Sequence, residues 1–356
     1  MARKVHSVLY LYKGLSRTSL LHDIECGRAP TTALRGYEWL VNDSSFVVDF
    51  LDSSDALPKI LRKVVPQFFL EFLLVPKLLS YDFVIASDFI PLLAVTSVLG
   101  RPFKRGRVLY AALNAAVLIE RSRNNLVRRQ ILIWLWSTYY RFVCIAESQR
   151  AILVANGLPE RSLFHVPYGI DADFFASVRY KSEGSYIVSI GRDLGRDYKT
   201  FLRAVEGLPY PVIIATTRKN IPKGIHIPGN VEIRYDVTID DVRELYRDAR
   251  FSCISLVGET SLEGSDCTGQ TVMMEALSAG QPVIVTDRKW IAEYFESGLE
   301  YRGVPAGDAD ALRLAIQELW NDTELRSELS KSARVAVRKY NAKRMSEGFA
   351  VLLNND

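Results

Sequence analysis

The sequence predicts an α/β protein built from two Rossmann-like, doubly wound domains. Short runs rich in Val and Ile alternate with longer helical patterns, which is typical of parallel sheets covered by helices. This alternation begins near residue 7 and begins again near residue 186. A chain of 356 residues also exceeds what one hydrophobic core usually organises. We therefore expect one sheet in each half of the chain.

The expected strands follow from the short apolar runs. In the first half they cover 7–11, 46–50, 83–86, 107–110, 142–146 and 163–166. In the second half they cover 186–191, 211–215, 231–235, 251–256 and 282–286. Between the two sets, Pro167 fixes one dihedral angle and Gly169 permits a positive φ, so a bend is expected. We place the domains at 1–165 and 179–337, a hinge at 166–178, and a last helix at 338–356.

Composition narrows the class of protein. Hydrophobic residues make up 48% and charged residues 24%, which describes a soluble globular chain. The four cysteines are scattered without a C-x-x-C spacing, so neither a zinc site nor a disulfide framework is expected, and a reducing cytoplasm fits best. The first apolar stretch is too short for a signal peptide, and no run is long enough to span a bilayer.

Positive charge is concentrated in one stretch of the first half. The net charge is +4, but residues 1–165 carry +8 and the remainder −4. Residues 101–141 hold nine Arg or Lys, among them Arg121, Arg123, Arg128 and Arg129, against one acid. The adjoining Ile131–Trp136 run leaves two interpretations open: a surface held against anionic lipid, or the buried face of a helix. No nucleic-acid-binding motif accompanies these cations, so nucleic acid is not expected as a partner.

A glycine loop in the second half predicts an anion site. Gly269, Gln270 and Thr271 stand where a helix begins, and unpaired N–H groups at a helix N-terminus attract anions such as a diphosphate. Glu275 lies one turn further along and can reach a group beside the phosphate, such as ribose hydroxyls. The alternative is an ordinary surface helix whose glycine only loosens its start.

A second cluster follows the first strand of the second half. Gly191 and Arg192 stand at the carboxyl end of that strand, the edge where open α/β sheets bind ligands, and Lys199 begins the next helix. Two cations at this edge are able to neutralise a leaving diphosphate. The alternative is that both are solvated surface charges.

Taken together, these segments resemble the family-four retaining glycosyltransferases, whose two facing Rossmann-like domains form the architecture called GT-B. Four pieces match in order: Val166–Phe174, Gly191–Lys199, Gly269–Pro282 and Gly303–Asp308. The resemblance implies that Arg192 and Lys199 hold the diphosphate of a nucleotide sugar as catalytic cations, with Gly191 beside them. It also implies that Thr268, Gly269, Gln270 and Thr271 cradle that diphosphate and that Glu275 bonds the ribose. The last helix is implied to pack back on the N-terminal domain.

One departure from the family concerns the donor sugar. The family usually carries a second glutamate eight positions before Glu275, where this chain has Cys267. We take Asp266 as the replacement in preference to Glu263 or Glu259. Members with a Gly-Gln-Thr loop resemble this chain, so the change does not imply loss of activity.

The first half resembles the acceptor side of the family more weakly. Gly14, Ser16 and Arg17 occupy the loop after the first strand, which in the family faces the donor. The family's catalytic histidine or aspartate has no histidine counterpart in this half, so Asp88 and Asn114 are the positional candidates, with a helix cap as the alternative for Asp88. A carbohydrate or lipid-linked acceptor is implied.

The activity implied by the resemblance is glycosyl transfer with retention of configuration, in glycolipid or polysaccharide assembly. The scattered cysteines favour a cytoplasmic protein, and the first interpretation of the basic stretch would make it peripheral on the inner membrane face. D-x-D is the metal-binding motif of a different glycosyltransferase architecture, and this chain has two such pairs, Asp171–Asp173 and Asp308–Asp310. The first lies in the hinge and the second precedes a helix, where acids favour the positive helix end, so no metal is expected. An epimerase or a phosphorylase would need motifs that we do not find. A catalytically inactive, nucleotide-sugar-binding scaffold is the second hypothesis, and Cys267 motivates it.

Overall fold

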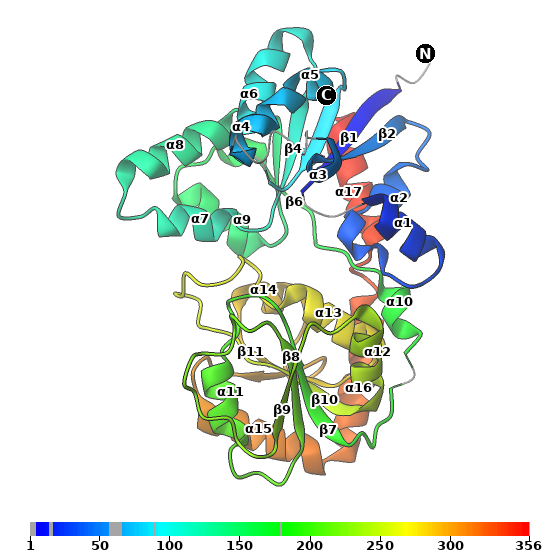
Figure 1. Cartoon of the computed structure of the whole chain (residues 1–356), viewed down its shortest axis with the longest axis vertical. Coiled ribbons are helices and arrows are strands. Elements are labelled where there is room, and N and C mark those ends of the chain that lie inside the picture. Colours follow the sequence, from blue (N-terminus) through cyan, green and yellow to red (C-terminus); the bar gives the residue numbers. More distant parts are fainter. Residues whose placement is uncertain (1–4, 14–16, 57–65, 89, 179, 356) are drawn as a thin grey trace. The chain divides into compact units, whose positions relative to one another are not determined.

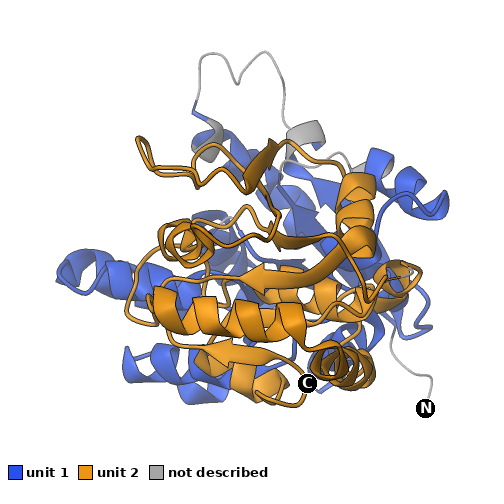
Figure 2. Cartoon of the chain, turned by 90° about the horizontal axis from the view of Figure 1, so that it is seen from below, with its two compact units in different colours: residues 1–169, 342–356 blue, residues 170–341 orange. Residues whose placement is uncertain are grey.

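The computed structural model describes residues 5–13, 17–56, 66–88, 90–178 and 180–355 (Figure 1). Two compact units are present (Figure 2). Unit 1 comprises Met1–Gly169 with Ala342–Asp356, and unit 2 comprises Ile170–Asn341. The first boundary, after Gly169, lies inside the hinge predicted at 166–178. The last helix, predicted from 338, begins at Ala342. Each unit is an α/β sandwich, as the alternating pattern of the sequence predicts.

Unit 1 is built on a six-stranded parallel sheet in the order β2-β1-β3-β4-β5-β6. Its strands are β1 His6–Tyr12, β2 Phe46–Asp52, β3 Phe83–Ala86, β4 Arg107–Ala112, β5 Arg141–Cys144 and β6 Leu163–His165. Its helices are α1 Arg17–Glu25, α2 Tyr37–Leu40, α3 Ser53–Ala56, α4 Gln67–Glu71, α5 Val75–Leu79, α6 Ile90–Gly100, α7 Ala115–Arg121, α8 Leu126–Ser137, α9 Glu147–Ala155 and α17 Ala342–Asn354. Short 3₁₀ turns are η1 Thr31–Leu34, η3 Phe72–Leu74, η4 Arg101–Phe103 and η5 Glu160–Ser162.

Unit 2 is built on a second six-stranded parallel sheet in the order β12-β11-β10-β7-β8-β9. Its strands are β7 Tyr186–Ile190, β8 Val212–Thr216, β9 Val231–Tyr235, β10 Ala249–Ile254, β11 Val283–Thr286 and β12 Arg302–Val304. Its helices are α10 Ala172–Ala176, α11 Tyr198–Val205, α12 Ile239–Asp248, α13 Gln270–Ala279, α14 Lys289–Tyr294, α15 Ala309–Asn321 and α16 Thr323–Val337.

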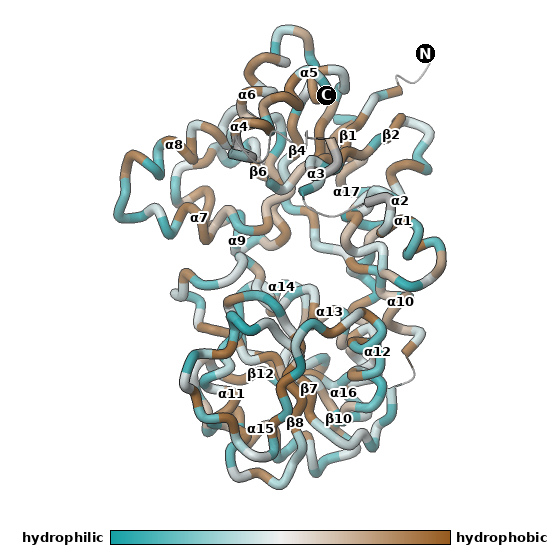
Figure 3. Tube along the Cα trace, in the orientation of Figure 1, coloured by the Kyte–Doolittle hydropathy of each residue, from teal (hydrophilic) through white to brown (hydrophobic). Residues whose placement is uncertain are grey.

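The inner strands form because their residues are apolar on both faces, whereas the edge strands β2 and β9 alternate with exposed residues. Every residue of β3, β8 and β11 is buried, which is the pattern of a parallel strand covered by helices on two sides. Burying a large apolar side chain stabilises a domain by about 1.5–3 kcal/mol. Figure 3 shows hydrophobic residues along α6 and a mixture along α8, so α6 is the more deeply seated of the two.

The final helix belongs to unit 1. Helix α17 packs on α2, with the ammonium of Lys343 5.7 Å from the centre of the Trp39 ring. Its close approach requires Gly36, because a Cβ there would lie 3.0 Å from the Cβ of Ser346. The chain therefore ends in the same unit in which it begins.

Candidate functional site

The order in which the chain adds strands to the sheet of unit 2 reverses between β7 and β10. From β7 the chain proceeds outward through β8 and β9, and from β10 it proceeds the other way through β11 and β12. In open α/β sheets the crevice outside the carboxyl ends of the strands at such a switch point is where ligands bind. Gly191 directly follows β7 and Ser255 directly follows β10, so the two loops singled out from the sequence start at this point.

The two loops run antiparallel and are tied together by Asp193. The amide of Asp197 donates to the carbonyl of Ser255 at 3.0 Å, and the amide of Val257 donates to that of Gly195 at 3.0 Å. The Asp193 carboxylate accepts from the amide of Gly195 at 2.7 Å and the hydroxyl of Ser265 at 2.6 Å, and also from the Thr268 hydroxyl. Burial alone would raise the pKa of Asp193, but these hydrogen bonds lower it below its usual value. Asp193 is therefore an ionised carboxylate that positions both loops.

A buried guanidinium occupies the centre of this arrangement. Arg196 is 5% exposed, and its Nη2 donates to the carbonyl of Ile190 at 2.6 Å. Its Nε and Nη1 find no hydrogen-bond partner among the described residues. Gly191 leaves room for it, because a Cβ at Gly191 would overlap the guanidinium. Buried charged groups are normally paired, so the unpaired N–H groups of Arg196 indicate a site for an anion.

Glu275 does not neutralise this charge. Burial raises the pKa of Glu275 to about 8, and the nearby Arg196 guanidinium only partly opposes that rise. A carboxyl with so raised a pKa holds its proton more firmly than usual near neutral pH, so it carries little charge to pair with Arg196. A neutral carboxyl can also donate a hydrogen bond, which suits contact with a sugar hydroxyl.

The N-terminus of α13 adds hydrogen-bond donors to the same site. Gly269 precedes the helix at a φ of 83° and provides no side-chain cap for the first turn. Gln270 is 3% exposed, and its Nε2 has no hydrogen-bond partner in the part of the chain that the structure describes. Thr268 is fully buried and Thr271 is half-buried. The predicted loop thus stands at the switch point with donors that protein groups leave unused.

Arg192 and Lys199 lie nearer to solvent than Arg196. Arg192 is exposed, and its Nη2 donates to the carbonyl of Val237 at 2.9 Å. Lys199 is exposed in the first turn of α11 and has no hydrogen-bond or ion-pair partner within the described residues. The structure therefore places Gly191 against the Arg196 guanidinium, with Glu275 near enough to feel its charge. Gly269 lies beside Ile254 and Leu256 at the end of β10, and the two predicted cations are exposed.

The carboxylates near Cys267 occupy different environments. Cys267 is 6% exposed, Asp266 is half-buried, and Glu263 is exposed. Glu259 pairs with Arg288 at 3.2 Å and accepts from the amide of Lys289 at 2.8 Å. Glu259 is therefore held by residues at the start of α14, and Asp266 remains the preferred candidate.

Unit 1 has its own switch point, between β1 and β3, which pair through Tyr10 and Ile85. Gly14 and Ser16 lie outside the described residues, and Arg17 begins α1. Asp88 is exposed after β3 and accepts from the Ser87 hydroxyl at 3.1 Å. Arg35 donates to the same hydroxyl and has a φ of 53°, an uncommon value for a residue other than glycine.

The two D-x-D pairs serve as helix caps. Asp171 accepts from the amide of Phe174 at 3.1 Å, and Asp308 accepts from the amide of Ala311 at 2.9 Å. A carboxylate at either position stabilises its helix by about 1 kcal/mol. Within the described ranges, no group of three or more metal-ligating side chains comes together.

Three residues of these sites were missed from the sequence. Arg196 and Asp193 are ordinary charges in the linear pattern, and Arg35 carries no motif. The sequence does show a glycine, Gly191, and an arginine, Arg196, on the same loop. Their relation is visible only in the folded loop, where the guanidinium lies against the glycine.

Comparison with known proteins finds a family match over part of unit 2. Residues 202–322, which run from α11 through α15 in unit 2, match the family described as glycosyl transferases group 1. No curated protein sequence matches the chain.

Solved structures share the fold over nearly the whole chain. HepE from Anabaena, solved with UDP-glucose, superposes with a TM-score of 0.68 at 13% identity, covering 99% of this chain and 100% of that one. A glycosyltransferase from Rickettsia africae gives a TM-score of 0.69 at 13% identity, covering 99% and 100%. Sucrose-phosphate synthase from Thermosynechococcus elongatus gives 0.65 at 12% identity, covering 98% of each.

The fold defines a GT-B protein with two Rossmann-like units. Residues 202–322 are similar to the group 1 glycosyltransferases, and together with the fold this similarity supports a glycosyltransferase.

Proposed function

We propose that this chain transfers a glycosyl unit from a nucleoside-diphosphate sugar to an acceptor hydroxyl. Unit 2 binds the donor at the switch point between β7 and β10, and unit 1 binds the acceptor. The observation that carries this proposal is Arg196, a cation that is 5% exposed and keeps two unused N–H groups beside the first turn of α13. A diphosphate supplies the negative oxygens that those groups lack.

The proposed mechanism centres on the leaving group. Negative charge grows on the diphosphate as its bond to the sugar breaks, and the buried guanidinium and the α13 amides stabilise that charge where it develops. Arg192 and Lys199 add positive charge from the solvent side of the same edge. These protein groups replace a metal ion, so we propose that turnover needs none.

The contacts to the sugar nucleotide follow from the remaining polar groups. Glu275 bonds the ribose, Asp266 takes the place of the usual sugar-binding glutamate, and Asp88 contacts the acceptor side. The resemblance to the retaining family supports an α-linked product from an α-linked donor. HepE, which shares the fold, was solved with UDP-glucose, so UDP-glucose is the first donor to test.

An inactive, nucleotide-sugar-binding subunit is the second candidate. Cys267 favours it, because a buried thiol stands where a sugar-binding carboxylate is expected. The two candidates share the diphosphate site and differ in turnover. A cytoplasmic role in glycolipid or polysaccharide assembly suits either one.

A donor panel distinguishes them. The full chain is incubated with UDP, GDP, ADP and dTDP sugars while free nucleoside diphosphate and binding heat are followed. We expect one donor to release its nucleoside diphosphate slowly, and we expect Arg196→Met to lose most of this release. Binding without release favours the inactive subunit, and no binding of any member contradicts both. With a simple acceptor, the anomeric proton coupling of the product tests retention.

A further inference from the structure

We infer that the outward face of α8 is a docking surface for an anionic lipid bilayer. This helix, Leu126–Ser137, lies in unit 1, away in the sequence from every residue assigned to the donor. The inference uses its exposed side chains and the charges around them. It does not depend on which donor is used.

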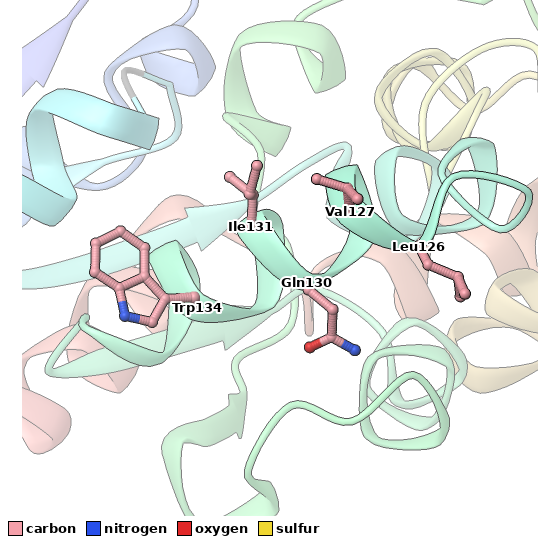
Figure 4. A pocket seen from close by; sticks show the side chains of 5 residues that line it. All are labelled: Leu126, Val127, Gln130, Ile131 and Trp134. Atoms are coloured by element: carbon pink, nitrogen blue, oxygen red, sulfur yellow. The ribbon is translucent and has the colours of Figure 1, made fainter.

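The outward face of α8 is apolar. Leu126 is 68% exposed, Val127 71%, Ile131 51% and Trp134 63%. With Gln130 they line a groove of about 440 Å³ that contains no charged side chain (Figure 4). We call these five residues the α8 face. Large exposed apolar residues gathered on one helix face mark a contact site more often than an ordinary wet surface.

The same helix has a second, buried side. Trp136 is 1% exposed and packs edge-on to Phe142, while Leu132, Ile133 and Leu135 pack against the core of unit 1. The interpretation of the Ile131–Trp136 run as the buried face of a helix therefore holds for Trp136 but not for Ile131 and Trp134. The packing of α8 is already satisfied by its inner side, so the α8 face does not serve the fold.

Cations surround the start of the α8 face. Arg121, Arg123 and Arg128 are exposed, and residues 121–141 contain no acidic residue. Neither Arg123 nor Arg128 has an acidic partner among the described residues. Arg129 differs, because it is half-buried and donates to the carbonyl of Asn156 at 3.3 Å.

The placement of these cations opposes the helix dipole. Arg128 and Arg129 occupy the first turn of α8, which carries no acidic residue, although cations are unfavourable at the positive end of a helix. An external anionic surface offsets that cost. A protein partner of ordinary composition supplies less negative charge over the same area, whereas anionic headgroups supply it continuously.

The remaining cations of the predicted basic stretch are used differently. Arg105 pairs with Asp82 at 3.3 Å, and Arg107 stacks 3.9 Å above the centre of the Phe83 ring. Around α8 the stretch combines exposed arginines with a whole exposed apolar helix face, whereas the turn at Arg101–Phe103 offers a single exposed apolar side chain, Phe103. This combination fits the interface of a bilayer, where Trp and Leu enter the headgroup region and arginines contact phosphates. None of the described helices has the length and hydrophobicity to cross a bilayer, so the contact is a surface one.

The test is co-sedimentation of the full chain with vesicles of phosphatidylcholine alone or with about a third phosphatidylglycerol, at about 50 and 500 mM salt. Binding is expected only with the anionic vesicles and weakens with salt. Replacing Arg121, Arg123 and Arg128 with Gln lowers the partition coefficient about fivefold per arginine. The matched control replaces three exposed cations of unit 2 with Gln: Arg203, Lys219 and Lys223.

The apolar contribution is tested separately. Ile131→Ser with Trp134→Ser is expected to abolish binding, and Leu314→Ser with Val335→Ser, on equally exposed positions of unit 2, is expected to leave it unchanged. Trp134→Phe removes the blue shift of tryptophan emission that anionic vesicles induce. Thermal unfolding and donor hydrolysis should be unaffected in all of these variants, which separates this inference from the proposed activity.

Equal binding to neutral vesicles, or no binding at low salt, overturns the inference. Sedimentation equilibrium without lipid identifies the competing occupant. A dimer at micromolar concentration that the Ile131 and Trp134 substitutions dissociate would make the α8 face a contact between two copies of the chain instead.

Discussion

Replacing Arg196 with methionine removes the guanidinium while keeping a long, flexible, apolar side chain in the space beneath Gly191. The Arg196 side chain makes one protein hydrogen bond through Nη2, to Ile190, and leaves Nε and Nη1 unused. The substitution therefore removes little from the fold and, if the proposal is right, two charge-assisted hydrogen bonds from the bound diphosphate.

The expected loss follows from those two groups. A hydrogen bond involving a charged partner contributes about 1.5–3 kcal/mol, so two contribute about 3–6 kcal/mol. At about 1.4 kcal/mol per factor of ten, kcat/KM should fall by roughly 10²–10⁴. Most of the loss should appear in kcat, because the diphosphate becomes more negative in the transition state. The free energy of unfolding should change by less than about 1 kcal/mol, since an unpaired buried charge is itself unfavourable.

The assay is steady-state release of nucleoside diphosphate from the preferred donor, with urea unfolding measured on the same samples. Arg196→Lys should restore only part of the activity, because one ammonium cannot reproduce the two directions of Nε and Nη1. Arg203→Gln, an exposed arginine on the same helix–loop segment, is the control and should behave as wild type. If Arg196→Met keeps kcat/KM within about fivefold, or loses activity only as far as it loses stability, the placement of the diphosphate is wrong.

Three further predictions concern the same edge of unit 2. Arg192→Ala and Lys199→Ala should each lower kcat about tenfold or more without changing the free energy of unfolding. The double variant should lose less than the product of the two single fold-losses in kcat. Full turnover in either single variant would remove that residue from the site. Activity should persist in EDTA, and complete loss that Mg²⁺ or Mn²⁺ reverses would refute the assignment of the leaving-group charge to protein groups. Because the pKa of Glu275 is raised from 4.5 to about 8, its ionisation destabilises the folded chain progressively as pH rises from about 4.5 to 8, by at most about 5 kcal/mol. Glu275→Gln should flatten that slope in urea unfolding between pH 5 and 9, and an unchanged slope would contradict the assigned pKa.

Strand positions could be predicted well from the sequence, because fully apolar runs such as 212–216 have no other stable environment. The first strand of unit 2, predicted at 186–191, is observed at 186–190. β12 was missed as a strand, because Arg302-Gly303-Val304 is too short and too polar to resemble one. Its three residues join the sheet through pairing with β11, which is a tertiary effect.

A candidate site could be proposed from the sequence, but its cations could not be ranked. Gly269 and Glu275 were proposed because a glycine before a helix and an acid one turn later follow local rules. The choice among Arg192, Arg196 and Lys199 depends on which side chain the loop turns inward. That is set by contacts with Ser255 and Leu256, which lie in the loop after the neighbouring strand β10. Likewise, the exposure of Trp134 and the burial of Trp136 depend on the rotation of α8 about its axis.

The uncancelled charge of Arg196 has a consequence for the end of the catalytic cycle. A free nucleoside diphosphate carries more negative charge at neutral pH than the same diphosphate esterified to a sugar. A buried cation that Glu275 does not neutralise therefore attracts the spent nucleotide more strongly than the fresh donor. The spent nucleotide competes with the fresh donor for this site, and the steady-state rate should fall as free nucleoside diphosphate accumulates relative to the donor. An inhibition constant for the nucleoside diphosphate above the Michaelis constant of its donor would show that this coupling does not operate.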